Sequence, residues 1–153
     1  NLIHKESGIP LNIINLHMKC CDSGLTRRIA ASKMLYEYLE VNYSNGIENF
    51  IILGDWNDDL KDKPGQHCFQ NFFDDPKYFF TNLELAQDIK QASYPKEPYY
   101  SFLDHILVIE DFISKEQIYK VSTLPIDMYM GGYEFYEAYI SDHKPVLLSF
   151  RIE

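Results

Sequence analysis

The chain has 153 residues, of which 46% are hydrophobic and 24% charged, and this balance is typical of one globular domain. Its formal net charge of −9 disfavours tight, sequence-independent binding along a nucleic-acid backbone, because such binding draws most of its affinity from Lys and Arg. No apolar run approaches membrane-spanning length, so no membrane span is predicted.

The first predicted element is a hairpin over residues 1–17. Residues 2–3 form a short strand, residues 6–8 have turn chemistry, and residues 11–17 form a strongly apolar strand. Because the second strand is too apolar for an exposed edge, we predict that it lies centrally in a sheet.

The clearest helix is predicted over residues 25–43, before the stop signal Asn45-Gly46. Residues 50–53 then form a short buried strand that ends at Gly54. This strand–helix–strand order predicts a crossover connection between parallel strands. The apolar residues at helical spacing are Leu25, Ile29, Met34, Leu35, Tyr38, Leu39 and Tyr43.

The second half of the chain is predicted to alternate loops with strands. Residues 54–100, punctuated by proline and glycine, are expected to be mostly loop with one or two short helices. Strands are expected at residues 102–109, 117–122 and 145–152, and residues 124–139 suit an ordered surface loop. Strands and a helix alternate, which predicts the α/β class.

Four polar clusters lie at the ends of these apolar strands or within them. Ligands of open α/β sheets bind at strand ends, so this placement predicts a single site. The clusters are Asn15-Leu16-His17, Gly54-Asp55-Trp56-Asn57, Leu103-Asp104-His105 and Ser141-Asp142-His143.

Each cluster also has a structural interpretation. An isolated histidine such as His17 is more often a hydrogen-bonded structural residue, and residues 54–57 suit a turn. Asp104 lies in an apolar strand and needs a polar partner of some kind. Residues 141–143 suit a loop that leads into the last strand.

In their order along the chain, the clusters resemble the endonuclease/exonuclease/phosphatase superfamily, the group that includes deoxyribonuclease I. A strand ending in Gly-Asp-aromatic-Asn precedes a strand with Asp-His-Ile, and Ser-Asp-His-Lys-Pro-Val enters the last strand. The upstream Asn-Leu-His-Met and its following helix fit the same order, so the match spans residues 11–150. The resemblance implies a deoxyribonuclease I-like sandwich, with residues 1–153 as the C-terminal part of one domain: mainly one mixed β-sheet with a flanking helix.

The resemblance also implies a role for each matched residue. Asp55 orients or deprotonates the attacking water near a metal, and Asn57 hydrogen-bonds the phosphate or the metal-bound water. Asp142 is a metal-proximal carboxylate. His143 contacts the scissile phosphate and takes part in acid–base chemistry, and Asp104 orients it.

Three further residues belong to the matched motifs. His17 matches a second histidine, which holds the phosphate or protonates the leaving group in deoxyribonuclease-like members. Trp56 replaces the usual Phe, a conservative departure. His105 follows the matched aspartate and is expected to be structural.

The residue types suit phosphoester hydrolysis without reference to any family. Oxygen ligands such as Asp55, Asn57 and Asp142 fit Mg²⁺ or Mn²⁺, which polarises phosphate or lowers the pKa of bound water. A histidine held by a carboxylate, here His143 with Asp104, has a fixed tautomer and orientation. We therefore expect a metal-dependent phosphodiesterase or nuclease that acts on DNA, RNA or a small phosphodiester.

One part of the family's site has no counterpart in this sequence. The family's early half carries an asparagine and a glutamate that complete the metal site, and Glu6 in a hairpin turn is a poor substitute. We expect the key glutamate, with the N-terminal half of the domain, to lie outside these residues and the isolated fragment to be inactive. Its apolar inner sheet face should need a partner, such as a second copy. A non-catalytic binding module on the same fold is the alternative.

Five further charged residues near these motifs have a simple structural interpretation. Asp58, Asp59 and Asp62 are interpreted as solvated loop charges, although Asp58 directly follows the motif. Arg27 and Arg28 either meet phosphate or lie on the helix surface.

The cysteines show no recognisable framework. Cys20, Cys21 and Cys68 are odd in number and two of them are adjacent, which favours thiols without chemistry. A bridge from Cys68 to one of the pair stays open in an oxidising compartment.

Overall fold

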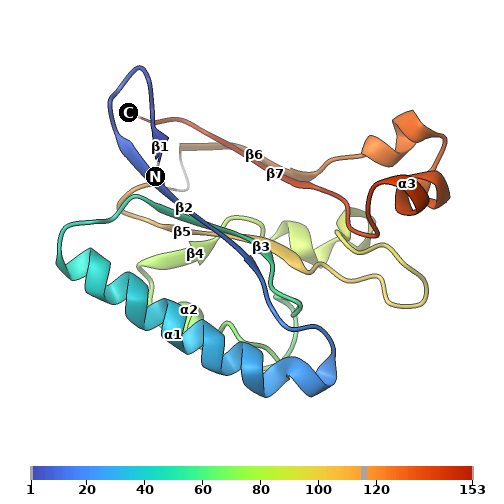
Figure 1. Cartoon of the computed structure of the whole chain (residues 1–153), viewed down its shortest axis with the longest axis horizontal. Helices are drawn as coiled ribbons and strands as arrows, with labels where there is room; N and C mark the ends of the chain where they lie inside the picture. Colours follow the sequence, from blue (N-terminus) through green and yellow to red (C-terminus); the bar gives the residue numbers. More distant parts are fainter. Residues whose placement is uncertain (1, 115–116, 153) are drawn as a thin grey trace.

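The computed structural model of the chain describes residues 2–114 and 117–152. A mixed five-stranded sheet carries helices on one face and a two-stranded sheet on the other (Figure 1). The strands are β1 (Leu2–Ile3), β2 (Pro10–His17), β3 (Phe50–Asp55), β4 (Tyr78–Phe80), β5 (Asp104–Ile109), β6 (Ile118–Thr123) and β7 (Val146–Phe150). The α-helices are α1 (Leu25–Ser44), α2 (Gln70–Phe73) and α3 (Tyr133–Tyr139). The predicted α/β class and mixed sheet are confirmed.

The five-stranded sheet has the order β1-β2-β3-β5-β4. Strands β2 and β3 are parallel, as the crossover through α1 predicts, and the other pairs are antiparallel. The carboxyl ends of β2 and β3 therefore meet the amino end of β5 at one end of the sheet. This end holds the candidate site.

The first hydrophobic core lies between the sheet and the helices α1 and α2. Leu39 of α1 is fully buried against it. Trp56, just after β3, is enclosed by the rings of Phe69, Phe72 and Phe80, with centroids 5.5–5.9 Å away at tilted or edge-on angles. Burial of such large aromatic rings anchors the segment that follows β3.

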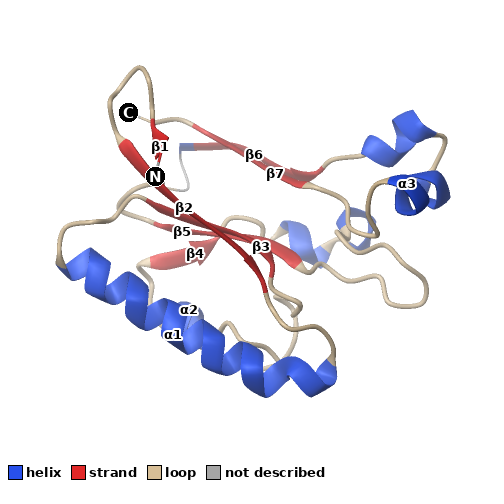
Figure 2. Ribbon diagram, viewed as in Figure 1, coloured by secondary structure: helices blue, strands red, loops and turns tan. Residues whose placement is uncertain are grey.

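The second core lies between the opposite face of the sheet and the two-stranded sheet β6–β7 (Figure 2). Ile51, Ile106 and Val108 point to this face and pack with Leu148 and Phe150. The predicted apolar inner face is thus present, and β6–β7 covers the part of it formed by β3 and β5.

One expectation about the elements holds only in part, and two are wrong. Strand β2 is central only at its start, because β1 pairs with Pro10 and Leu11 and leaves the rest of that edge without a strand partner among the described residues. Residues 78–80, expected in a loop, form β4 by pairing with β5. Residues 124–139, also expected to be loop, contain α3 and a 3₁₀ helix, η5 (Ile126–Met130), which pack together.

Further 3₁₀ turns connect the main elements: η1 (Asp22–Gly24), η2 (Leu85–Gln87) and η3 (Ile89–Gln91). None of the helices in the described part of the chain is long and apolar enough to cross a membrane.

Candidate functional site

Three of the predicted site residues are neighbours across the sheet. His17 at the end of β2 is in register with Asp55 at the end of β3, and Asp55 with Asp104 at the start of β5. Paired residues of adjacent strands project from the same face, here the face that β6–β7 covers. The pleat and register therefore bring an imidazole and two carboxylates together.

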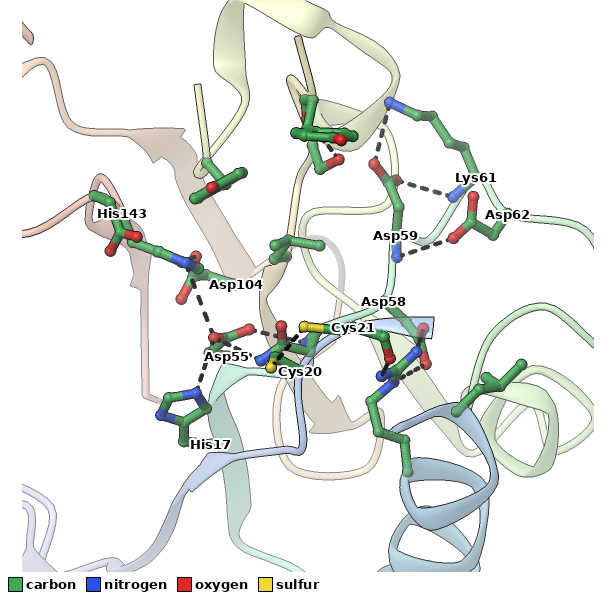
Figure 3. A pocket seen from close by; sticks show the side chains of 18 of the residues that line it. His17, Cys20, Cys21, Asp55, Asp58, Asp59, Lys61, Asp62, Asp104 and His143 are labelled. Carbon is green, nitrogen blue, oxygen red and sulfur yellow. Dashed lines mark hydrogen bonds and ion pairs between the residues drawn. The ribbon is translucent and has the colours of Figure 1, made fainter. Parts of the chain in front are cut away.

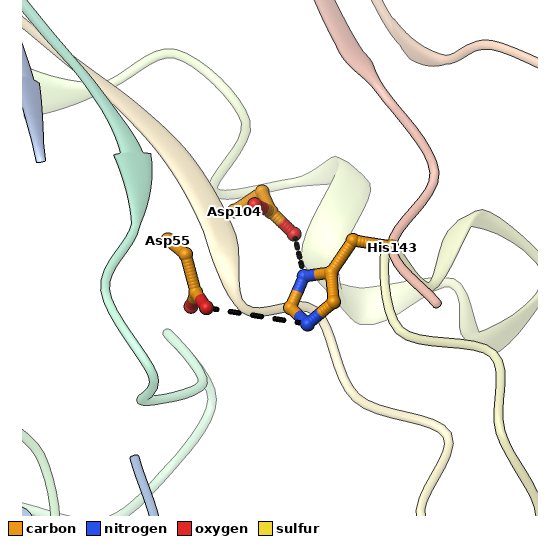
Figure 4. A group of neighbouring side chains, drawn as sticks. All are labelled: Asp55, Asp104 and His143. Carbon is orange, nitrogen blue, oxygen red and sulfur yellow. Dashed lines mark hydrogen bonds and ion pairs between the residues drawn. The ribbon is translucent and has the colours of Figure 1, made fainter. Parts of the chain in front are cut away.

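The fourth residue, His143, reaches this row from the loop before β7 (Figure 4). Its Nδ1 lies 2.7 Å from Oδ2 of Asp104, and its Nε2 lies 4.0 Å from Oδ2 of Asp55. The imidazole thus stands between the two carboxylates, which is the orientation that the sequence predicts for Asp104 and His143.

Asn57 fixes the Asp55 carboxylate through a tight turn. Its backbone N–H donates to Oδ1 of Asp55 at 2.8 Å, and its Nδ2 donates to Oδ2 at 2.9 Å and to the Met18 carbonyl at 3.0 Å. Asn57 has a φ of 55°, a left-handed conformation that asparagine tolerates better than most residues. Nε2 of His17 lies 3.4 Å from the same carboxylate, and the His17 side chain is 76% exposed.

These residues line one pocket with a volume of about 1190 Å³ (Figure 3). All six predicted site residues belong to its lining: His17, Asp55, Asn57, Asp104, Asp142 and His143. Asp142 is exposed and lies outside the compact group that Asp55, Asp104 and His143 form.

Burial and the neighbouring carboxylates perturb the ionisation of Asp55 and His143. Burial, and then the charge of Asp104, raise the pKa of Asp55 against the opposing effects of Asn57, His143 and His17. Burial lowers the pKa of His143, but the hydrogen bond to Asp104 and the surrounding carboxylates outweigh it, and the net shift is upward. Both shifts favour the protonated forms, so the site should also favour the binding of a cation.

The compact group fits a hard divalent cation. Asp55, Asp104 and His143 each offer one ligand atom, and these atoms lie within 4.8 Å of one another. Mg²⁺ commonly takes one or two protein carboxylates and keeps several waters. Of the ligands expected from the sequence, Asp55 is in this group, whereas Asn57 turns its Nδ2 onto Asp55.

The structure corrects the interpretation of Arg28, Asp58 and Asp59, all of which are buried. Nε and Nη2 of Arg28 donate to the Asp58 carboxylate at 2.8 and 2.5 Å. Asp59 accepts from the Phe102 backbone N–H at 3.0 Å. These two acidic residues are therefore structural anchors for the segment after Asn57.

Sequence reasoning also missed the residues that join Asp104 to the His143 loop. Ser93 is fully buried, and its Oγ accepts from the backbone N–H groups of Leu103 and Asp104. Its carbonyl accepts from the Lys144 N–H at 2.7 Å, and Tyr136 of α3 donates to the His143 carbonyl at 3.1 Å. No local pattern around Ser93 signals this function.

His105 behaves as the sequence predicts for a structural histidine. It is fully buried; its Nδ1 accepts from Asn82 at 2.8 Å and its Nε2 donates to the Asp58 carbonyl at 2.9 Å. Burial lowers the pKa of His105 to about 4, so its ring is neutral at physiological pH.

A scan against protein-family models finds none that matches this chain, and a search of curated proteins finds no match.

Proposed function

We propose that this chain belongs to a metal-dependent phosphoester hydrolase of the endonuclease/exonuclease/phosphatase type, with a deoxyribonuclease I-like sandwich. The main support is the arrangement of four side chains in one pocket at the end of adjacent strands: the His143 imidazole lies between the carboxylates of Asp55 and Asp104, and His17 lies beside Asp55. Carboxylates for a cation and histidines for phosphate are the side chains that this hydrolysis requires.

His143 is assigned to the phosphate. Its Nδ1 donates to Asp104, so its tautomer and orientation are fixed and Nε2 is directed toward Asp55. The raised pKa favours the protonated ring, which neutralises charge on a phosphoryl oxygen and can supply a proton.

Asp55 is assigned to the attacking water. Asn57 holds both of its oxygens, so the carboxylate keeps one orientation while it accepts a proton from that water. His17 is 76% exposed with its Nε2 3.4 Å from Asp55, and we propose that it holds the phosphate or protonates the leaving oxygen.

The carboxylates of Asp55 and Asp104 would hold Mg²⁺ or Mn²⁺, which supplies charge neutralisation on the phosphate when it is bound. The key glutamate that the family resemblance implies is proposed to come from outside these residues. The net charge of −9 favours a small or short phosphodiester, bound through the cation, over a long nucleic-acid backbone.

The test is hydrolysis by the complete gene product, with Mg²⁺ or Mn²⁺, of a nitrophenyl phosphodiester and of DNA and RNA oligonucleotides. We expect His143→Ala to lower the rate about 10²- to 10⁴-fold. His4→Ala is the matched control, because His4 lies outside the pocket lining. Hydrolysis that is equal in the wild-type protein and the His143→Ala variant would overturn the proposal.

Calorimetric titration with Mg²⁺ and Mn²⁺ separates an enzyme from a binding module. Because cation and proton compete for Asp55, binding should strengthen as pH rises through the elevated pKa of that carboxyl. Metal binding without hydrolysis of any substrate would favour the non-catalytic module.

A further inference from the structure

Two adjacent thiols converge in the loop that follows β2. In an extended chain, successive side chains point to opposite sides. Cys21 instead has a φ of 70°, and its Sγ lies 2.8 Å from Sγ of Cys20. A left-handed backbone is uncommon for a residue other than glycine, so this loop holds its two sulfur atoms together at a conformational cost.

The sulfur pair lies in the candidate site. Cys20 and Cys21 both line the pocket that contains Asp55 and His143 (Figure 3). Cys20 is partly exposed and Cys21 is exposed, whereas Cys68 is buried. Small oxidants can therefore reach the adjacent pair.

We propose that Cys20 and Cys21 form a redox modification site, which a peroxide converts into a disulfide between neighbouring residues. One thiolate attacks the peroxide, its O–O bond breaks, and a sulfenic acid and one water form. The second thiol then attacks the sulfenic sulfur, the S–S bond forms and a second water leaves. The two thiols lose two electrons and two protons, and hydrogen peroxide is reduced to two waters.

Such a disulfide is readily reversible. Neighbouring Cα atoms lie about 3.8 Å apart across a trans peptide. Most disulfides join Cα atoms about 4.4–6.8 Å apart, and departures from this geometry store strain that eases reduction. Strained, exposed disulfides are the labile and regulatory ones.

The loop with these thiols is bonded to the groups that hold Asp55. The Met18 carbonyl accepts from Nδ2 of Asn57 at 3.0 Å, and the Met18 N–H donates to the Asp55 carbonyl at 2.8 Å. Nη1 of Arg28 donates to the carbonyls of Lys19 and Cys21 at 2.7 and 2.8 Å. Closing the sulfur ring rotates the peptide between these anchors, so oxidation should weaken metal binding at Asp55.

Peptide mapping of the peroxide-treated protein tests the disulfide without any assumption about enzyme activity. Cleavage after Lys19 and Arg27 releases residues 20–27, which contain both thiols but not Cys68. We expect this peptide to lose two hydrogens and to resist N-ethylmaleimide until dithiothreitol is added. Sulfinic or sulfonic acid on a single cysteine, or a bridge to Cys68 or to a second molecule, would overturn the assignment.

The effect on the site is tested with matched variants. We expect peroxide to weaken Mn²⁺ binding about tenfold, measured by calorimetry, in the wild-type protein and in Cys68→Ser. Cys21→Ser, which cannot close the ring, should bind Mn²⁺ equally before and after treatment. A disulfide that forms with no change in Mn²⁺ affinity would overturn the coupling. This coupling rests on the proposed function: failure of Mn²⁺ to bind in either redox state refutes the metal site and leaves the mapping result intact.

Discussion

At the scale of single residues, the pair His143–Asp104 has the largest consequence for the site. Its hydrogen bond and the nearby carboxylates outweigh the burial of the imidazole, and the pKa of His143 is raised. A group whose pKa rises on folding contributes stability below its ordinary value of 6.5, and this contribution is lost as pH increases through the raised value.

Asp104→Asn should therefore lower the pKa of His143, because an amide accepts a hydrogen bond but carries no charge. The loss of folding stability should be larger at acidic pH, where His143 is protonated, than at alkaline pH. NMR titration of the ring protons measures the first effect, and urea unfolding at two pH values the second. The His4 signal, from the turn at the far end of β2, is the internal control. An unchanged His143 titration would contradict the prediction.

The proximity of the candidate residues was predictable, because His17 and Asp55 end apolar strands, Asp104 begins one and His143 precedes one, and strand ends lie together in an α/β sheet. The ion pair Arg28–Asp58 was not predictable, since it joins residues thirty positions apart and only tertiary packing buries it. An aspartate after a Gly-Asp-Trp-Asn turn looks the same in sequence whether it is solvated or buried.

At the scale of elements, α1 follows its predicted limits within one residue, but its buried side differs from the apolar stripe. Leu39 is buried, whereas Met34 and Tyr38 are exposed and the polar residues Arg28 and Ser32 are buried. Short elements were missed for another reason. Strand β4 has three residues, which are too few for a periodic pattern, and it forms by pairing with β5.

At Gly54, within β3, the structure leaves no room for a side chain. Its φ is 132°, and a Cβ there would lie 2.0 Å from the Leu16 carbonyl oxygen. Gly54→Ala should cost about 3 kcal/mol of folding stability, measured by urea unfolding.

The matched control is Gly46→Ala, at a φ of 76° with no atom within 4 Å of the added Cβ. This variant should cost only about 1 kcal/mol, from the left-handed backbone alone. Equal losses in the two variants would show that the contact with Leu16 is unimportant.

At the scale of the whole molecule, β6–β7 covers only part of the inner face. Leu2 and Ile13, which lie on this face at the β1–β2 side of the sheet, remain 57% and 44% exposed. The sequence predicted an apolar face in need of a partner, but it could not show that residues 118–150 supply part of that cover. The packing of two late strands on a sheet formed by earlier residues is a tertiary contact that no local sequence pattern indicates.

The exposed side of β2 should make residues 1–153 self-associate when they are expressed alone, because its edge beyond Leu11 has no strand partner among the described residues. Light scattering over a range of concentrations should show a monomer–dimer equilibrium. Ile13→Lys should shift it toward monomer, since a lysine at this position opposes strand addition. Tyr129→Lys, which changes an exposed aromatic residue outside the sheet, should leave it unchanged. A monomer at every concentration would contradict this prediction.

The candidate site is divided between the two sheets that face each other. Asp55 and Asp104 are paired within the five-stranded sheet, whereas His143 belongs to the connection into β7. In a local opening, β6–β7 would separate while the larger sheet stays folded. The carboxylates of Asp55 and Asp104 would then stay together, and the His143 imidazole would move away from them. Under the proposed function, such a partly opened molecule would keep the two carboxylates assigned to the cation and lose the imidazole assigned to the phosphate, so the packing of β6–β7 on the larger sheet would bring the two parts of the site together.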